Sequence, residues 1–416
     1  MEKRNEMKSK VLDKFLRYVK IDTEADERSD SFPSTEKQKD LGRLLFQELK
    51  DLGVDEAYFD EQYGYVYGKI EGNDETKQEK TIAFISHMDT APSFTGKGVN
   101  PRIIKDYDGE DIVLNQEEQI ILSVKKFPEI KNYKGKTLIT TDGTTLLGAD
   151  DKAGVAEIMT MAEILISNPE IKHGPVAICF TPDEEVGAGV DHIDLTRLGA
   201  DYGFTVDGGA LGELEYENFN AASAVCKIQG VNVHPGEAKN KMKHAALIGM
   251  ELEMMLPKNE KPQFTGGYEG FYHLTGIQGE EESARLDYII RDHSREKFEE
   301  KKVFMQQCVD FLNQKYGAKT IDLEIKDSYY NMKEKIEPDY FFLIEGAKKC
   351  MEELGIEPQI KPIRGGTDGA RLSYMGLPCP NLCAGGHNFH GRYEYVCLES
   401  MESIVELLVK LASLSF

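Results

Sequence analysis

The stretch Cys179–Gly189, C-F-T-P-D-E-E-V-G-A-G, decides how the rest of the chain is interpreted. It continues an apolar run, 176–180, that predicts a buried strand. After a Thr-Pro turn it presents three consecutive carboxylates, Asp183, Glu184 and Glu185. Adjacent acids repel one another and lose hydration when they are buried. We therefore expect them either in a solvated loop or around a cation, and the triplet alone does not separate these interpretations.

The bulk composition limits the class of protein. A chain of 416 residues exceeds the usual size of a single core, so two domains are expected. A formal net charge of −23 argues against nucleic acid and anionic membranes as partners. The charged N-terminal stretch is not followed by an apolar segment, which predicts no secretory signal, and no apolar run predicts a membrane span. Seven cysteines, an odd number, predict reduced thiols and a cytoplasmic protein.

The motif S-H-M-D-T places a histidine and an acid at the end of another apolar run. Residues 82–85 predict a short buried strand, and His87 and Asp89 follow it. Residues two apart on an extended chain point the same way, so Asp89 can hold the far nitrogen of the His87 imidazole. Partners of metal-bound histidines do this. The alternative is a surface histidine beside an acid.

Two further acids and a second histidine stand at comparable positions. Asp150 precedes a helix predicted over 153–166, and capping of that helix is the alternative role for its carboxylate. Asp207 closes the short apolar part of 201–209. His390 lies in the glycine-rich segment G-G-H-N-F-H-G-R.

Five residues thus share a position at the carboxyl end of an apolar run: His87, Asp150, Glu185, Asp207 and His390. In an α/β sheet those ends line the ligand crevice. Histidine mixed with carboxylate suits Zn, Co or Mn better than Ca. Five ligands exceed one tetrahedral ion but serve two ions about 3.5–4 Å apart when one carboxylate bridges them. Glu184, which would bind neither ion, could then take the proton of a metal-activated water.

The order of the expected elements predicts the fold class. Strands and helices alternate from about residue 80 to 210, which indicates an α/β domain. A β-α-β-β-α-β order over 215–332 predicts an inserted ferredoxin-like α+β domain. The α/β pattern then resumes, so 1–214 and 333–416 are expected to form one discontinuous domain. The chain lacks both G-x-S-x-G and a G-x-G-x-x-G that opens a helix, which argues against serine hydrolases and dinucleotide enzymes.

Seven motifs, in order along the chain, resemble the peptidase T family, the tripeptide aminopeptidases among the M20 dizinc metallopeptidases. They are S-H-M-D-T, L-L-G-A-D-D-K-A-G, F-T-P-D-E-E-V-G, T-V-D-G-G, V-N-V-H-P-G, K-P-I-R-G-G-T-D-G-A and N-F-H-G-R-Y-E-Y-V. The resemblance covers essentially the whole chain. It implies a mixed-sheet zinc-peptidase catalytic domain, with the inserted domain acting as a lid.

The resemblance also implies a role for each site residue. Two zinc ions are expected, with Asp150 as the bridging ligand and a cis peptide bond after it. Glu184 is expected as the general base, Glu185 as a ligand beside it, and Asp89 as the support of His87. Asp207 and His390 complete the two ligand sets.

The implied reaction is release of the N-terminal residue from tripeptides. The substrate carboxylate then needs a cationic group at tripeptide length, for which Arg291 and Arg364 are the candidates. His234 is the candidate for oxyanion support. Surface roles for these three residues are the alternative. The family often dimerises through the lid, so the resemblance also implies a homodimer as one outcome.

The chain departs from the family pattern at three positions, where Glu237, His244 and His387 stand for the expected Thr, Asn and Tyr. None is a predicted ligand, so they bear on fine specificity. Two other functions stay open. One is a related amidohydrolase, such as a dipeptidase, carboxypeptidase or deacylase, and the other is a non-catalytic binder. The presence of Glu184 argues against the binder.

Overall fold

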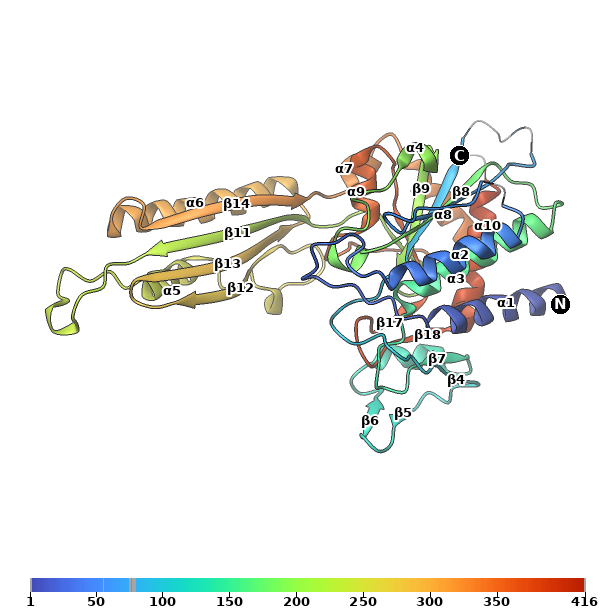
Figure 1. The fold of residues 1–416 in the computed structure, drawn as a ribbon, viewed down its shortest axis with the longest axis horizontal. Coiled ribbons are helices and arrows are strands. Elements are labelled where there is room, and N and C mark those ends of the chain that lie inside the picture. The colour runs from blue at the N-terminus through green and yellow to red at the C-terminus, as the bar shows by residue number, and fades with distance from the viewer. Residues whose placement is uncertain (1, 55, 75, 77–79, 415–416) are drawn as a thin grey trace. The chain divides into compact units, whose positions relative to one another are not determined.

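The computed structural model describes residues 2–54, 56–74, 76 and 80–414, and its contacts divide the chain into two compact units (Figure 1). The first unit comprises Met1–Tyr216, Glu334–Lys361 and Thr367–Phe416, and the second comprises Glu217–Lys333 and Pro362–Gly366.

The short segment Pro362–Gly366 differs from the sequence prediction, which gave it to the catalytic domain. In the structure the backbone N–H of Ile363 donates to the carbonyl of Glu217 at 2.8 Å. Arg364 donates to the carbonyl of Gly267 at 2.6 Å. The segment therefore belongs to the second unit. Its partners are about 100 residues or more away in sequence, so no local pattern could indicate them.

A mixed sheet of eight strands, counted over the described residues, forms the framework of the first unit. Its strands lie in the order β1 (Tyr58–Phe59), β2 (Val66–Ile70), β8 (Val176–Thr181), β3 (Ile82–His87), β9 (Tyr202–Gly208), β16 (Asn381–Cys383), β10 (Glu213–Glu215) and β15 (Gln359–Ile360). The central strands β8, β3, β9 and β16 are parallel, while β2 and β10 run antiparallel to their neighbours β8 and β16. Parallel strands bring their carboxyl ends to one edge, where the predicted ligands follow.

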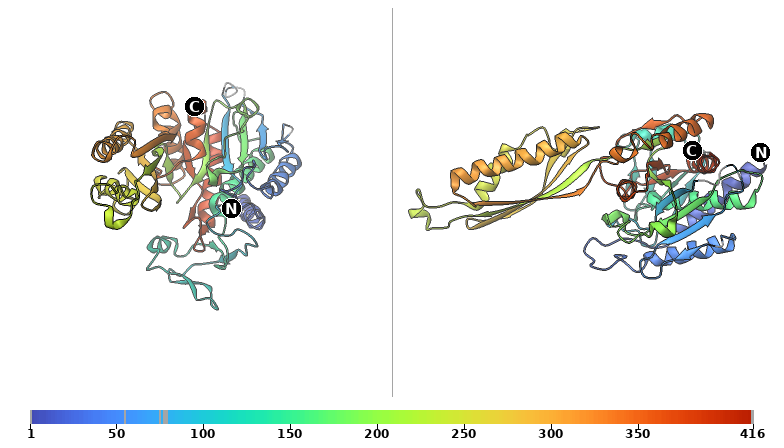
Figure 2. Two further views of the ribbon diagram at one scale, coloured as in Figure 1. Left: turned by 60° about the vertical axis from the view of Figure 1, so that its left-hand side comes forward. Right: turned by 90° about the horizontal axis from the view of Figure 1, so that it is seen from above.

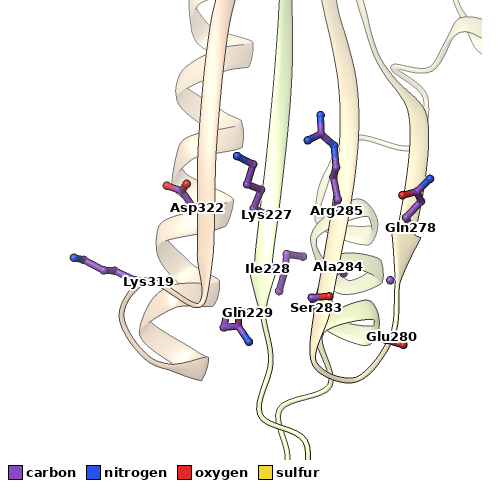
Figure 3. Close-up of a pocket in the computed structure, with 11 residues that line it drawn as sticks. Lys227, Ile228, Gln229, Gln278, Glu280, Ser283, Ala284, Arg285, Lys319 and Asp322 are labelled. Atoms are coloured by element: carbon purple, nitrogen blue, oxygen red, sulfur yellow. The ribbon is translucent and has the colours of Figure 1, made fainter.

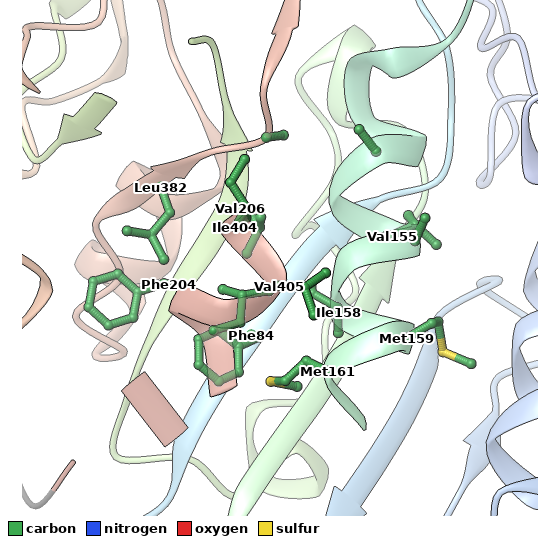
Figure 4. Packing of buried hydrophobic residues seen from close by; sticks show 14 of the residues in the cluster. Phe84, Val155, Ile158, Met159, Met161, Phe204, Val206, Leu382, Ile404 and Val405 are labelled. Carbon is green, nitrogen blue, oxygen red and sulfur yellow. The ribbon is translucent and has the colours of Figure 1, made fainter. Parts of the chain in front are cut away.

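Helices cover both faces of this sheet. They are α1 (Glu2–Tyr18), α2 (Gln38–Asp51), α3 (Ala149–Ser167), α4 (Leu195–Leu198), α7 (Lys333–Ile336), α8 (Phe342–Glu353), α9 (Asp368–Met375) and α10 (Leu398–Ala412). Helix α3 is apolar on nearly all sides because it is buried between the sheet and its neighbours α1 and α10. Phe84, Phe204, Ile158, Met161 and Val405 share its cluster (Figure 4). A separate cluster with α4 and α9 covers the opposite face of the sheet.

Smaller sheets complete the first unit. One contains β17 (Gly386–His387), β18 (Tyr395–Cys397), β7 (Leu138–Thr140) and β4 (Arg102–Ile104), and another pairs β5 (Ile112–Asn115) with β6 (Ile120–Leu122). Among the described residues, no helix combines the length and the apolar character needed to cross a bilayer.

The second unit is an antiparallel sheet covered by two helices (Figure 2). In chain order its elements are β11 (Asn220–Gln229), α5 (Ala245–Met255), β12 (Phe271–Gly279), β13 (Ser283–Asp292), α6 (Arg295–Tyr316) and β14 (Ile321–Tyr329). This is the predicted β-α-β-β-α-β order, with the strands arranged β12-β13-β11-β14. Alternate residues of β11 and β13 pack with both helices in one cluster, because successive strand side chains face opposite ways.

The other face of this sheet holds a hollow of about 610 Å³ (Figure 3). Lys227, Arg285 and Asp322 are among the side chains that line it. The lining mixes both signs of charge and contains no histidine, so it does not provide the mixed nitrogen and oxygen donors expected of a zinc site.

Candidate metal centre

The five predicted ligands all lie in the first unit, and the structure brings them together. Asp150 stands between the two histidines: its Oδ1 is 2.9 Å from Nε2 of His87, and its Oδ2 is 3.0 Å from Nε2 of His390. Oδ1 of Asp207 lies 3.3 Å from Nε2 of His87, and Oε2 of Glu185 lies 3.1 Å from Nε2 of His390. At Nε2, each histidine therefore faces one carboxylate of its own and shares Asp150 with the other.

Different elements of the fold deliver these side chains. His87 is the last residue of β3 and pairs in register with Thr181 of β8, so the acidic turn after β8 starts beside it. Asp207 is near the end of β9, and Asp150 stands at the start of α3. The peptide bond between Asp150 and Asp151 is cis, as the family resemblance implied.

The contacts of His87 test whether these residues fit a cation. Its Nδ1 lies 3.1 Å from the carbonyl oxygen of Asp89, while its Nε2 faces carboxylate oxygens of Asp150 and Asp207. A neutral imidazole has only one N–H, so one ring nitrogen would present a lone pair to an oxygen acceptor. A cation bound between the ring nitrogen and the carboxylate oxygens removes this contact between two electron-rich atoms. The donor set therefore fits a bound cation.

Glu185 gives a second indication of the same kind. Within the described part of the chain, its buried Oε1 has no hydrogen-bond partner, although its Oε2 faces His390. One ligand atom each of His87, Asp150 and Glu185 lie within 4.8 Å of one another. An open carboxylate oxygen beside two other donors is what a metal ligand requires.

Burial and charge shift the pKa values of these groups. Burial raises the pKa of Glu185 to about 7 and that of Asp207 to about 6. Burial acts in the same direction on Asp150, but hydrogen bonds with His390 and His87 outweigh it and hold the pKa of Asp150 below its usual value. Hydrogen bonds with Asp150 and Glu185 raise the pKa of His390 to about 11. The metal-free site thus attracts protons, which compete with metal ions for the same atoms.

Asp89 connects the first histidine to the acidic turn. It is fully buried, and its two carboxylate oxygens accept the backbone N–H groups of Glu184 and Glu185 at 3.0 and 3.1 Å. Its Oδ1 is also 3.3 Å from Nδ1 of His87. Glu184 itself is half-buried, and burial together with the negative charge of Asp207 raises its pKa well above the usual value.

The third acid of the triplet, Asp183, does not join the site. Its backbone has φ 55°, and its buried carboxylate accepts hydrogen bonds from the backbone and hydroxyl of Ser34 and from the amide of Gln38. It anchors the segment before α2. The interpretation of the triplet as a solvated loop is therefore wrong for Asp183, because its carboxylate is buried and accepts three hydrogen bonds from protein donors.

Several supporting residues were not identified from the sequence. Glu394 is buried and accepts the backbone N–H groups of Leu147, Gly148 and Asp150, so it fixes the loop that presents Asp150. The side chain of Asn381 accepts the N–H of Asp207 at 3.2 Å. Glu394 lies in a motif that carried the resemblance, but nothing in the pattern distinguished it from a surface acid.

Asp151 is also buried beside the centre. Its Oδ2 accepts hydrogen bonds from the hydroxyl of Ser86 and the backbone N–H of His87. Its ligand atoms also lie within 4.8 Å of those of His87 and Asp207. Its buried Oδ1 has no hydrogen-bond partner among the described residues, so Asp151 could serve one ion beside His87 and Asp207. Asp150 faces both histidines, and it is therefore the better candidate for the shared ligand.

The three predicted substrate residues lie in the second unit, at two separate places. Arg291 pairs with Ala221 near the start of β11, and its Nη1 donates to the carbonyl of Ala222 at 3.2 Å. His234 is exposed and follows the other end of β11. At about 3.3 Å per residue, that end of the strand is about 25 Å from Ala221, the residue beside Arg291. An extended tripeptide spans about 10 Å. His234 and Arg291 of one chain therefore cannot contact the same tripeptide.

Arg364 has partners of its own within the second unit. Its guanidinium donates to the carbonyls of Gly267 and Glu269 and to the hydroxyl of Thr265, and it stands 5.0 Å from the ring centre of Phe219. These contacts tie two loops together. Arg364 therefore has a structural role whether or not it also binds substrate.

Comparison with known proteins identifies close relatives in sequence. Residues 140–414 match the family model described as Peptidase family M20/M25/M40. A protein named peptidase T from Alkaliphilus oremlandii is 58% identical over 405 residues, which cover 97% of this chain and 98% of the relative. The proteins of the same name from Caldanaerobacter subterraneus and Bacillus subtilis are 57% and 54% identical over 406 residues, with 98% of both chains covered in each case.

Solved structures with the same fold are more distant in sequence. The aminopeptidase PepT from Bacillus cereus superposes with a TM-score of 0.76 at 23% identity, and a tripeptidase from Staphylococcus aureus with 0.75 at 20%, each covering 98% of both chains. A dinuclear metal-binding M20 peptidase from Bacillus subtilis gives 0.65 at 14%, again over 98% of both chains. These likenesses confirm the predicted fold class. The chain belongs to peptidase family M20/M25/M40 and, within it, to the group of proteins named peptidase T.

Proposed function

We propose that this chain is a metallo-aminopeptidase that releases the N-terminal residue from tripeptides. The observation that carries the proposal is the position of Asp150, whose two oxygens lie 2.9 and 3.0 Å from the Nε2 atoms of His87 and His390. One carboxylate shared by two histidine–carboxylate pairs suits a binuclear hydrolase. The names peptidase T and tripeptidase among its relatives and structural neighbours support the substrate class.

Two Zn²⁺ ions per chain are the proposed cofactors, with Co²⁺ or Mn²⁺ able to substitute. Asp150 would bridge them, His87 and Asp207 would hold one ion, and His390 and Glu185 would hold the other. Nitrogen and oxygen donors in this mixture suit these metals. When bound, the two cations polarise the scissile carbonyl and lower the pKa of a shared water.

Glu184 is the proposed general base. Its carboxylate takes a proton from the attacking water and delivers it to the leaving amine. A raised pKa suits a carboxylate that must hold this proton between the two transfers. Asp89 positions the acidic turn by accepting the N–H groups of Glu184 and Glu185, and it also faces His87.

The second unit is proposed as the lid that selects the substrate. A tripeptide carries a carboxylate at a fixed distance from the reacting carbonyl, and a cation is needed to hold it. Arg291 and Arg364 are the proposed cations, and each already donates to backbone carbonyls of the second unit. His234 remains the proposed residue for oxyanion support. His234 and Arg291 of one chain cannot contact the same tripeptide, so the two roles would not be filled together by one chain.

Location and assembly complete the proposal. All seven cysteines are free and buried, which supports the reducing environment of the cytoplasm. A homodimer through the second unit is supported by exposed apolar side chains on its two helices: Leu247, Met250, Met254, Val303, Phe304 and Phe311. Light scattering of the purified protein tests the dimer, and a monomer at micromolar concentration would exclude it.

The Glu184→Gln variant tests the mechanism. It removes the base but keeps the size of the side chain, so we expect both metals to stay bound while turnover falls by a factor of about 10² to 10⁴. Glu27→Gln, at an exposed position, is the matched control. Full activity of Glu184→Gln would remove the assignment of the base.

The substrate class is tested with a series of di-, tri- and tetrapeptides and with an N-acetylated tripeptide. A tripeptide aminopeptidase cleaves the free tripeptide and leaves the acetylated one intact. Cleavage of the acetylated peptide would instead favour a deacylase or carboxypeptidase of the same family.

A further inference from the structure

The hydrogen bonds that hold Glu184 are made by its backbone. Among the described residues, its side-chain oxygens make no hydrogen bond within the protein. Glu184 is the first residue of a single 3-10 turn, η3 (Glu184–Val186). Its N–H is held by Asp89 at 3.0 Å, and its carbonyl accepts the N–H of Gly187 at 2.7 Å. Whatever fixes Asp89 and Gly187 therefore also fixes the base.

Helix α9 braces the far end of this turn. Nη1 of Arg371 donates to the carbonyl of Gly187 at 2.8 Å, and its Nη2 pairs with the carboxylate of Asp191. One guanidinium thus holds two points on the loop that follows η3. The carboxylate of Asp368, at the start of α9, lies against Gly189, where an added Cβ would overlap its oxygens.

Gly187 is the residue of this loop that Arg371 holds. It has φ 74°, and an added Cβ at this position would meet no atom within 4 Å. Glycine has the largest range of backbone conformations, so hydrogen bonds to its N–H and carbonyl help to restrain it. The N–H of Ala188 donates to the carbonyl of Asp183 at 2.9 Å, and the hydroxyl of Tyr65 donates to the carbonyl of Gly189 at 2.9 Å.

We propose that Arg371 is a positioning residue for Glu184. By fixing the carbonyl of Gly187, it holds the 3-10 turn in place and keeps the carboxylate of Glu184 where it meets the attacking water. The inference rests on the proposed role of Glu184 as the general base. Among the described residues, the hydrogen bonds and ion pair of Arg371 go to Gly187 and Asp191 and to none of the five ligands. Its loss should therefore lower kcat while KM and metal content stay unchanged.

The test combines Arg371→Ala with Glu184→Gln in the full-length, metal-loaded enzyme. A displacement of about 1 Å at a catalytic group costs up to about a hundredfold in rate, so we expect Arg371→Ala to lower kcat by about tenfold to a hundredfold. In the Glu184→Gln background the same substitution should change the residual rate by less than about twofold, because residues that act as a unit are not additive. Arg371→Lys, which keeps one of the two contacts, should give an intermediate kcat.

Matched measurements separate this role from a general effect on folding. Arg43→Ala removes an exposed arginine that pairs with Glu61 at 3.1 Å, and it should leave both rates unchanged. Asp191→Asn weakens only one partner of Arg371, and it should lower kcat less than Arg371→Ala does. If Arg371→Ala does not fold, Asp191→Asn in the two backgrounds provides the same comparison.

Four outcomes would overturn the inference. Wild-type kcat in Arg371→Ala is the first, and loss of bound metal in that variant is the second. The third is an equal loss of rate in the wild-type and Glu184→Gln backgrounds, which would show that Arg371 acts on something other than the base. Full activity of Glu184→Gln is the fourth. Only this last result would also remove the proposed mechanism.

Discussion

Replacing Asp89 by Asn changes one atom at the point where the first histidine meets the acidic turn. In the native protein, both oxygens of this fully buried carboxylate accept backbone N–H groups, from Glu184 at 3.0 Å and from Glu185 at 3.1 Å. Oδ1 is also 3.3 Å from Nδ1 of His87. Asparagine has the same shape, but one oxygen becomes an NH₂ group. A donor then faces a donor, and one N–H of the turn loses its acceptor.

The magnitude has two parts. A buried N–H without an acceptor costs about 1–3 kcal/mol, and the bond that remains loses the strength of its ionised acceptor, so the folded protein should lose about 2–4 kcal/mol. At the metal centre, the carboxylate no longer supports the imidazole of His87. Changes to such supporting groups reduce metal affinity or activity by about 10- to 100-fold, which corresponds to about 1.4–2.8 kcal/mol.

The assay measures both parts on the same preparations. Competition with a chelator gives the affinity of the more tightly bound metal, and hydrolysis of a tripeptide gives kcat and KM. Unfolding by denaturant, with metal removed, gives the change in stability. Asp30→Asn, at an exposed position, is the control and should change none of these quantities. If Asp89→Asn kept wild-type metal affinity and lost less than about twofold in kcat, Asp89 would not support His87 as argued.

Three further predictions concern the pH, a glycine and the substrate carboxylate. Burial raises the pKa of Glu185 to about 7 and that of Asp207 to about 6 in the metal-free chain, so both take up protons as the pH falls from 7 to 5. Protons bind only the metal-free site, so metal should be released across this range, and metal content unchanged after dialysis at pH 4.5 would contradict the ligand assignment. Gly189→Ala should cost about 1–3 kcal/mol of stability and lower kcat, because its Cβ overlaps the carboxylate of Asp368; a wild-type denaturation midpoint would refute this. Arg291→Ala should raise KM by about tenfold or more for a tripeptide but not for the same tripeptide with a C-terminal amide, since only the former has a carboxylate to lose; equal effects on both would exclude the pairing.

Much of the candidate metal centre could be predicted because its proposed ligands follow a local rule. His87 ends β3 and Asp207 is near the end of β9, and both strands are visible in sequence as short apolar runs. Parallel strands place such ends at one edge, so the meeting of these residues follows from the fold class. The order of elements in the second unit was predictable for a similar reason, since alternation and helical periodicity are local properties.

Other features depend on contacts between distant parts of the chain. Glu394 reaches back more than 240 residues to hold the loop of Asp150, and Arg371 reaches back more than 180 to hold Gly187. Both are charged residues with no periodic neighbours, so in sequence they look like ordinary surface groups. The separation of His234 from Arg291 likewise became apparent only once β11 was seen to lie between them.

The amino-acid sequence by itself determined which residue types stand at the ends of the strands, and hence that a mixed histidine and carboxylate site is formed. Only the tertiary structure decided which way each carboxylate of the acidic triplet points, with Asp183 turned to Ser34 and Glu185 turned to His390. The physical reason is the range of the forces involved. Strand and helix formation depends on neighbours within a few residues, whereas the direction of a buried charge depends on whichever donors the folded chain brings within about 3 Å.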